Sequence, residues 1–448
     1  MASIATSSGS PPMRAVRGTD LAVLAARGLC LLALVFCSGD LWPTVSVGFT
    51  FRLSQLAILG AAVLCAIASV DRPFRLFAGW QWLAGFVFWL VLTMPLSLYF
   101  ERTLGYVAWA LNDLLIVVVF RQCFTTDFDT ERLLRWYIAS FAFIACLGLA
   151  QFALGIIGID ILIQQWWFPD VLPRINGLSY EPSYFATYLM MGWVGAAYLL
   201  ERGIAAPSRR LQWFTLGVTT LALVLCASRL GWVFMVLWLG FRGMLQAAVS
   251  LRRGVITRTQ LRLLSTGMVL LLGLAAVIFR FRDLVGEVLS KASFLLAGIG
   301  FLSETSHSSE TRASALEQTW QAFINHPWIG TGIGALPVDI AHQQGAGVTS
   351  LDDAKVYEGL SITAEILAST GLVGGALLAG FAVSVIIAYA RARPALNRAR
   401  AEACAAVGWG ILWLVLMLQF SPTFLRIYLF FAIAVVVCAI SSPVRRPE

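Results

Sequence analysis

The chain alternates between long apolar runs and short polar segments. Runs of about 20 apolar residues are long enough to cross a bilayer as helices. The chain holds about twelve such runs, the first near residues 20–38 and the last near 424–441. This pattern predicts an all-α fold, a polytopic membrane bundle of about twelve transmembrane helices.

Composition excludes several classes of protein. Apolar residues make up 59% of the 448 residues and charged residues 12%, about half the usual charged share. A soluble protein cannot bury that much apolar surface, which excludes a secreted enzyme, a disordered chain and a conventional nucleic-acid binder. The eight cysteines show no paired spacing and no Cys-x-x-Cys motif, so we expect neither disulfides nor a zinc site.

Arginine placement predicts the topology. If the N-terminus is cytoplasmic, the inside segments hold 21 basic residues and the outside segments hold 10. Basic residues collect on the cytoplasmic side of membrane proteins. Both termini are therefore expected in the cytoplasm, and the net charge of +8 needs no nucleic-acid partner.

The spacing of the spans divides the chain into three segments. Residues 1–279 form an N-terminal membrane bundle of about nine spans, and residues 368–448 form a C-terminal bundle of about three. Between them, residues 280–367 form one large outer loop, and a shorter outer segment runs from about 156 to 182. Long loops on one side of a bundle often carry function.

The large outer loop contains a helical stripe. Apolar residues recur there every three or four positions, at Ala313, Leu316, Trp320 and Phe323, with polar residues between them. We expect an amphipathic helix that lies along the outer face of the bundle.

Three outer arginines have no role in setting the topology. They are Arg174, Arg229 and Arg312, on three separate outer segments. Arg229 follows a nearly absent turn between two spans, so its charge lies near membrane depth, where it needs an anion or carbonyl groups around it. Glu181, at the start of a span, and His326, in the large loop, are candidates for acid–base chemistry.

At these residues the chain resembles the O-antigen ligase and polysaccharide polymerase superfamily of bacterial inner membranes. Four motifs carry the resemblance in the order of the family, within roughly residues 170–390. They are Arg174-x-x-Gly177 with Glu181-Pro182-Ser183, Ser228-Arg229-x-Gly231, Arg312 followed by His326-Pro327-x-x-Gly330-x-Gly332, and Thr370-Gly371-Leu372-x-Gly374.

The resemblance implies glycosyl transfer at the periplasmic face. The donor would be a glycan on undecaprenyl diphosphate. The acceptor would be another lipid-linked glycan for an O-antigen, capsule or exopolysaccharide polymerase, or lipid A core for an O-antigen ligase. The resemblance implies no cofactor and no metal; membrane lipids, chain-length regulators and flippases are candidate partners.

One departure favours the polymerase. The ligases of the family carry a histidine followed by Asn, Ser or Gln, nine residues before the last glycine motif. Ser361 holds the second of these positions, but Leu360 stands where the histidine would be. The general base is therefore open, with Glu181 first, His326 second, and Glu358 and Glu365 third.

The three arginines suit this chemistry because negative charge grows on the diphosphate as the anomeric bond breaks. Fixed cations at that point stabilise the transition state more than the ground state. The planar guanidinium of arginine binds phosphate oxygens bidentately and keeps its charge. We therefore expect Arg174, Arg229 and Arg312 to converge if the large loop folds over the bundle. A base opposite the leaving group predicts inversion at the anomeric carbon.

Two other interpretations compete with this one. Asp127-Phe128-Asp129 is an Asp-x-Asp motif, which holds a metal and a nucleotide sugar in soluble glycosyltransferases, but it lies on the predicted inside. Arg27 and Asp113 lie within apolar spans, and intramembrane charges are functional candidates by default. They suggest either a lipid-linked oligosaccharide flippase or transporter, or an Arg27–Asp113 pair that only stabilises the bundle.

Overall fold

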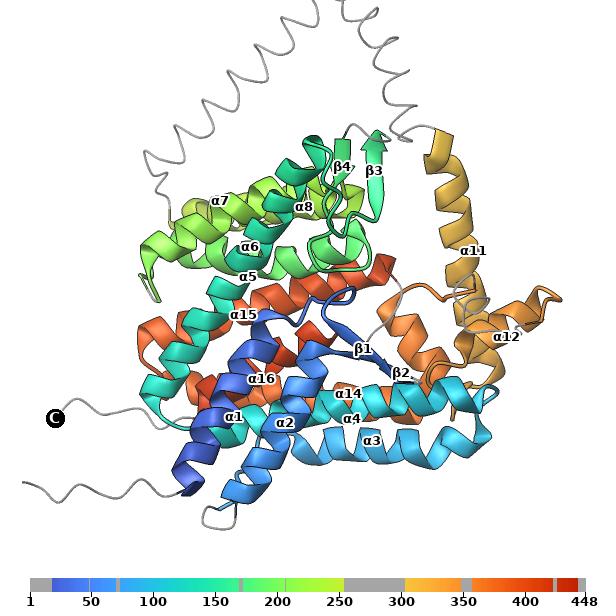
Figure 1. Cartoon of the computed structure of the whole chain (residues 1–448), viewed down its shortest axis with the longest axis horizontal. Coiled ribbons are helices and arrows are strands. Elements are labelled where there is room, and N and C mark those ends of the chain that lie inside the picture. Colours follow the sequence, from blue (N-terminus) through green and yellow to red (C-terminus); the bar gives the residue numbers. More distant parts are fainter. Residues whose placement is uncertain are drawn as a thin grey trace, which may run out of the picture.

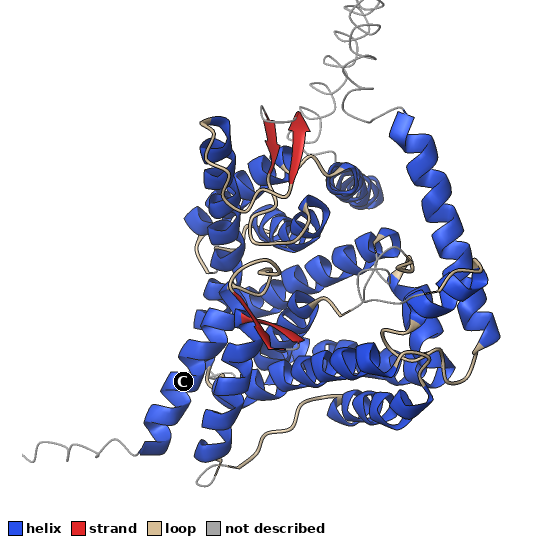
Figure 2. Cartoon of the chain, turned by 45° about the vertical axis from the view of Figure 1, so that its right-hand side comes forward, coloured by secondary structure: helices blue, strands red, loops and turns tan. Residues whose placement is uncertain are grey.

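The computed structural model describes residues 18–47, 49–69, 73–168, 172–205, 207–253, 303–347, 357–421 and 425–441. These residues form a helical bundle with two small β-hairpins (Figures 1 and 2). The expected span near residues 263–279 and the first part of the large loop lie outside the described residues.

Eleven of the predicted spans correspond to helices. They are α1 (Gly18–Val35), α2 (Leu53–Ala68), α3 (Trp80–Thr93), α4 (Phe100–Cys123), α5 (Asp127–Ile156), α6 (Pro182–Glu201), α7 (Arg209–Leu225), α8 (Arg229–Arg253), α14 (Ile362–Ala392), α15 (Arg398–Met417) and α16 (Ile427–Ser441). The prediction of a mainly helical fold is therefore confirmed.

The predicted number of spans is not confirmed. Five of the described helices are long and apolar enough to cross a membrane. They are α4, α5, α8, α14 together with the 3-10 turn that follows it (Ile362–Ala395), and α15 together with the 3-10 turn that follows it (Arg398–Phe420). Shorter apolar helices include α2 and α16. The shortest of these depart from the usual length of a span, which is about 20 residues.

Helix α6 lies at the centre of the bundle and packs against α5, α7, α8 and α15. Its Phe185, Tyr188 and Met190 are completely or almost completely buried. By contrast, Val236 and Met244 of α8 are 68% and 75% exposed. Exposed apolar side chains on outer helices are expected where a bundle faces lipid.

Helix starts follow ordinary capping chemistry. Thr126 and Asp129 form a capping box at the start of α5, and the Asn397 side chain accepts a hydrogen bond from the Arg400 amide at the start of α15. Pro182 is the first residue of α6, where a missing amide hydrogen costs nothing.

The two hairpins were not expected from the sequence. Strand β1 (Thr44–Val47) pairs antiparallel with β2 (Phe49–Arg52), and β3 (Gln165–Phe168) pairs antiparallel with β4 (Leu172–Arg174). Both hairpins connect helices at the end of the bundle where α4, α6, α8 and α14 begin, which we call the outer end.

Loops at the outer end are joined to one another. The amides of Asp40 and Leu41, after α1, donate hydrogen bonds of 2.9 and 3.0 Å to the Leu178 carbonyl, before α6. Arg52, at the end of β2, forms an ion pair of 2.9 Å with Asp40. The two connections therefore form one layer over the bundle.

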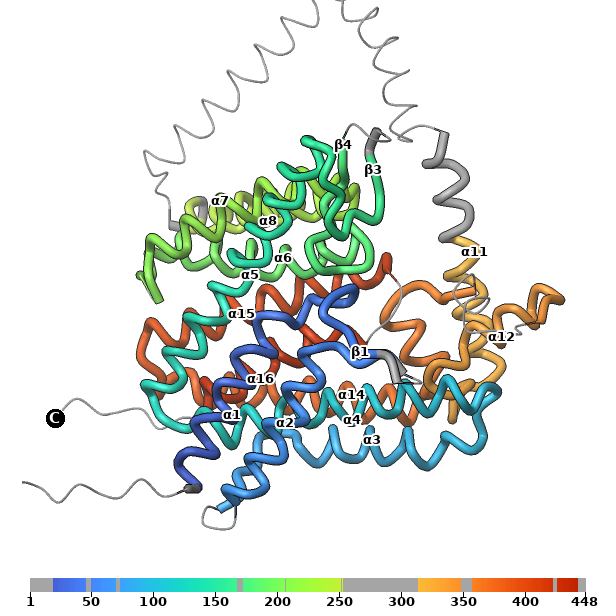
Figure 3. Tube along the Cα trace, viewed as in Figure 1, coloured from blue at the N-terminus to red at the C-terminus, as the bar shows by residue number. Residues whose placement is uncertain are grey.

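The large loop contributes two further helices. These are α11 (Ser303–Asn325) and α12 (Leu336–Gln343), which pack against the start of α14 (Figures 1 and 3). The helix over the predicted stripe is present, but its buried face differs from the prediction. Leu316 and Trp320 are 41% and 47% exposed, whereas Ala322 is completely buried against Leu336 and Ala368.

At the opposite end of the bundle, which we call the inner end, charged residues form ion pairs that join helices. Arg27 lies 2.7 Å from Asp129, and Arg400 lies 2.6 Å from Asp127. The suggested Arg27–Asp113 pair is wrong, because the Arg27 guanidinium reaches α5 instead. The two carboxylates of the Asp-x-Asp motif are therefore used to hold α1 and α15 against α5.

This arrangement predicts that Asp129→Asn destabilises the fold by about 1–3 kcal/mol, because Arg27 then loses its carboxylate. Glu131→Gln is the matched control, since Glu131 is exposed on the same helix. Thermal unfolding of the purified variants measures the difference. Equal unfolding temperatures for the two variants would contradict the structural role of Asp129.

Candidate functional site

Arg174 holds the turn that precedes Arg229. The β3–β4 hairpin places Arg174 so that its Nε and Nη2 donate to the carbonyls of Cys226 and Ala227, at 3.4 and 3.2 Å. Its Nη1 donates to Gln165 Oε1 at 2.7 Å. Two segments that are more than 50 residues apart in sequence are therefore joined at the outer end.

Arg229 is the first residue of α8 and is exposed. The turn before it includes Ala227 in the left-handed region, with φ of 50°, and the Ser228 hydroxyl accepts a hydrogen bond from the Gly231 amide. The side chain of Arg312 lies outside the described residues. Of the three predicted arginines, the described structure therefore brings together Arg174 and the turn that carries Arg229.

A fourth arginine, Arg426, is buried at the outer end. Only 5% of its surface is exposed, and its Cζ lies 3.6 Å from the ring centroid of Tyr184 in α6. The sequence places Arg426 among the outer cations but does not distinguish it from the others. Its position directly before the last apolar run, outside the predicted cytoplasmic segments, is the signal that could have identified it.

Glu181 lies beside this arginine site. It is the N-cap residue of α6, three residues before Tyr184, and its Oε2 accepts a hydrogen bond of 2.9 Å from the Ser183 hydroxyl. The carboxylate therefore stands at the positive end of the α6 dipole.

A second carboxylate enters from the large loop. Glu358 lies 3.6 Å from Arg102, whose side chain is only 9% exposed and also donates a hydrogen bond to the Tyr106 hydroxyl. Arg102, Tyr106 and Glu358 line a small cavity together with Glu365. The predicted candidates Glu358 and Glu365 are therefore neighbours.

Tyr184 connects the two groups of residues. Arg426, Glu181 and Glu358 all lie within electrostatic range of its hydroxyl. We use the name outer cluster for Arg102, Glu181, Tyr184, Glu358 and Arg426. Two arginines and two carboxylates from four separate segments of the chain thus gather at the outer end.

Ser361 has a structural role. It caps α14, its hydroxyl donates to Gln419 Oε1 at 2.7 Å, and it adopts a φ of 74°. The preceding Leu360, at the position of the missing histidine, donates its amide to Thr319 Oγ1. These contacts fix the segment that carries Glu358 between α11 and the end of α15.

The glycine-rich turn after α11 forms hydrogen bonds with α14 at the point where Gly371 interrupts that helix. Gly371 has φ of 66° and ψ of −174°, which interrupts the helix and frees carbonyl groups before it. The amides of Thr331 and Gly332 donate to the carbonyls of Ala368 and Ser369, at 2.8 and 3.1 Å. The Leu372 amide in turn donates to the Pro327 carbonyl at 2.8 Å.

This backbone contact explains the glycines of the motif. Gly330, Gly332 and Gly334 all have positive φ, and a Cβ added at Gly330 would overlap the backbone of Ser369 and Thr370. His326 contributes its carbonyl, which accepts a hydrogen bond from the Gly330 amide, while its side chain is exposed. Residues 326–334 and 368–372 therefore act as one clamp between the loop and the bundle.

The clamp predicts that Gly330→Ala is far more damaging than Gly345→Ala. Both glycines have positive φ, so both variants carry a conformational cost of about 1–2 kcal/mol. Gly345 has open space around its Cβ position, whereas Gly330 would also meet the α14 backbone. The unfolding temperature should fall sharply only in Gly330→Ala, and equal effects of the two substitutions would refute the clamp.

The comparison with known families covers three of the four motifs, because the motif at residues 174–183 lies before the matched part of the chain. The family model described as O-Antigen ligase matches residues 214–379, which run from α7 through the large loop and the clamp into α14. No curated protein gives a match to the chain. The match covers less than half of the chain, and over residues 214–379 it confirms the resemblance to the O-antigen ligase family, whose members are glycosyltransferase-like enzymes that act on lipid-linked glycans.

Proposed function

We propose that the protein is a polymerase-type glycosyltransferase of the bacterial inner membrane. It joins glycan repeat units carried on undecaprenyl diphosphate at the periplasmic face, making O-antigen, capsule or exopolysaccharide. The observation that supports this proposal most is the outer cluster, where Arg426 and Arg102 lie with Glu181 and Glu358 around Tyr184.

Arg426 supplies the fixed positive charge in this proposal. The acceptor hydroxyl attacks the anomeric carbon, and the bond from that carbon to the diphosphate oxygen breaks with its electron pair on the leaving group. A buried guanidinium that keeps its charge stabilises that developing anion more strongly than a solvated one. The ring of Tyr184 under Arg426 holds the guanidinium plane in place.

Glu181 is the first candidate for the base that removes the acceptor proton. It stands at the outer end within electrostatic range of Tyr184, the residue on whose ring Arg426 lies, and it accepts a hydrogen bond from the Ser183 hydroxyl. Glu358 is second, because it is partly neutralised by Arg102. His326 is the third candidate, since its side chain is exposed and lies on the clamp. Attack by the acceptor opposite the leaving group predicts inversion at the anomeric carbon.

Arg229 and Arg312 stay in the proposal as further contacts of the diphosphate. Arg174 changes role, because its guanidinium already donates to two carbonyls and an amide oxygen. We propose that it positions the turn of Arg229. The reaction uses arginines in place of a metal ion.

Leu360 favours the polymerase over the ligase, because it cannot act as the base that the ligase motif supplies. Purified protein incubated with undecaprenyl diphosphate-linked repeat units separates the alternatives. Longer lipid-linked glycans indicate a polymerase, and transfer to added lipid A core indicates a ligase. Unchanged donor together with transport into sealed vesicles indicates a flippase.

Arg426→Lys is expected to lower the rate of polymer formation by about 10²–10³-fold, because lysine cannot reproduce the planar guanidinium contact. Arg202→Lys is the matched control: its Cζ lies 5.3 Å from the Tyr198 ring centroid at the inner end of α6. Initial rates on lipid-linked repeat units measure both. A folded Arg426→Lys protein with the wild-type rate would remove Arg426 from the diphosphate site.

Glu181→Gln is expected to reduce the rate by about 10²–10⁴-fold, the usual contribution of a general base. The Glu358→Gln variant tests the second candidate, and Asp160→Asn, at an exposed carboxylate of the same outer segment as Glu181, serves as control. The pH dependence of the rate should lose its acidic limb only in the variant that lacks the base. If that limb persists in Glu181→Gln and disappears in Glu358→Gln, Glu358 is the base.

A further inference from the structure

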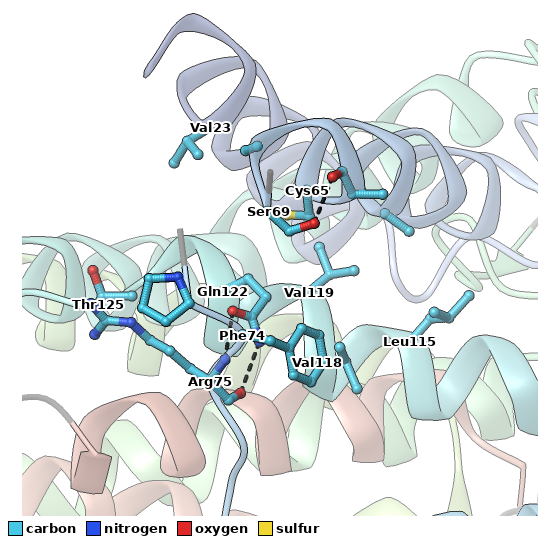
Figure 4. A pocket seen from close by; sticks show the side chains of 14 residues that line it. Val23, Cys65, Ser69, Phe74, Arg75, Leu115, Val118, Val119, Gln122 and Thr125 are labelled. Atoms are coloured by element: carbon cyan, nitrogen blue, oxygen red, sulfur yellow. Dashed lines mark hydrogen bonds between the residues drawn. The ribbon is translucent and has the colours of Figure 1, made fainter. Parts of the chain in front are cut away.

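A pocket of about 470 Å³ lies at the inner end of the bundle, away from the outer cluster (Figure 4). Its walls come from the end of α2, the end of α4, Val23 of α1 and the segment that leads towards α3. The lining is mainly apolar: Val23, Ala62, Cys65, Ala66, Leu115 and Val118 contribute most of the inner wall. Pockets of this size bind small molecules or parts of lipids.

The rim of the pocket is polar and fixed. Gln122 of α4 donates to the Arg75 carbonyl at 2.8 Å and accepts from the Arg75 amide at 3.0 Å (Figure 4). This pair holds residues 73–75 beside α4. The side chains of Phe74 and Arg75 are exposed, so an aromatic ring and a cation stand at the mouth of an apolar pocket.

A second cation lies beside the rim. Arg121 of α4 is only 9% exposed, and its Nε and Nη1 have no hydrogen-bond partner among the residues that the structure describes. It lies within electrostatic range of Arg75. Among the described residues neither arginine forms an ion pair with a carboxylate. A buried guanidinium without an acceptor is costly, and a bound anion would supply the acceptor that the described residues do not.

We propose that this pocket binds an anionic glycerophospholipid, with one acyl chain inside it and the phosphate between Arg75 and Arg121. The shape and the charge agree: the pocket is apolar within and has Arg75 in its lining, and Arg121 directly precedes the lining residue Gln122 on α4. Basic pockets between membrane helices on the cytoplasmic side are known to hold anionic headgroups. The diphosphate of a glycan carrier belongs at the outer end in our proposed function, so the two lipids occupy opposite ends of the bundle.

The test is native mass spectrometry of the full-length protein released from vesicles that contain equal amounts of phosphatidylglycerol and phosphatidylethanolamine. The wild type should retain phosphatidylglycerol preferentially. Ala66→Trp fills the pocket from α2 and should abolish the preference, whereas Val63→Trp, at an exposed position of α2 outside the lining, should preserve it. Arg75→Gln should weaken retention about fivefold, the share of one arginine near a lipid surface, and Arg209→Gln should not.

A second readout uses the native thiol of Cys65, which lines the pocket and is only partly buried. Added phosphatidylglycerol should slow maleimide labelling of Cys65 but not of Cys146, which is also partly buried and lies on α5. The proposal fails if both lipids are retained equally, if Ala66→Trp and Val63→Trp behave alike in folded protein, or if undecaprenyl phosphate displaces phosphatidylglycerol from the pocket.

Discussion

The close backbone contact between the glycine-rich turn and the break in α14 fixes the large loop onto the bundle. Gly371 interrupts the helix, and the amides of Thr331 and Gly332 donate hydrogen bonds to the carbonyls that the interruption leaves without helical partners. A Cβ at Gly330 would overlap the backbone of Ser369 and Thr370, and a Cβ at Gly371 would overlap the backbone of Trp328 and Ile329. Glu358 lies four residues before the start of α14. The contact therefore also fixes the position at which the Glu358 carboxylate meets Arg102.

Charge is distributed differently at the two ends of the bundle. At the inner end, Asp127 and Asp129 neutralise Arg400 and Arg27 directly, and these ion pairs hold helices together. At the outer end, Arg426 is buried over the Tyr184 ring, and Glu181 lies within electrostatic range of the Tyr184 hydroxyl. Ion pairs also form at the outer end, between Arg52 and Asp40 and between Arg102 and Glu358. The buried guanidinium of Arg426 lies on an aromatic ring instead, and in the proposed function it stabilises the charge that develops on a diphosphate.

The helices could be predicted from the sequence because long apolar runs leave few alternatives in a membrane. The two hairpins could not, since strands of three or four residues carry too little pattern. The buried face of α11 was placed incorrectly because packing against α12 and α14 selects Ala322 over the larger Leu316 and Trp320. Arg426 was missed for a related reason: its ring partner lies more than 200 residues away along the chain.

In the proposed function, a buried arginine at the outer end binds the diphosphate of a lipid-linked glycan. A structure of the protein with bound undecaprenyl diphosphate measures this most directly, through the position of the two phosphorus atoms. We expect phosphate oxygens within hydrogen-bonding distance of the Arg426 guanidinium, on the side of Glu181. A diphosphate bound at the inner end, or at the outer end without contact to Arg426, would contradict it.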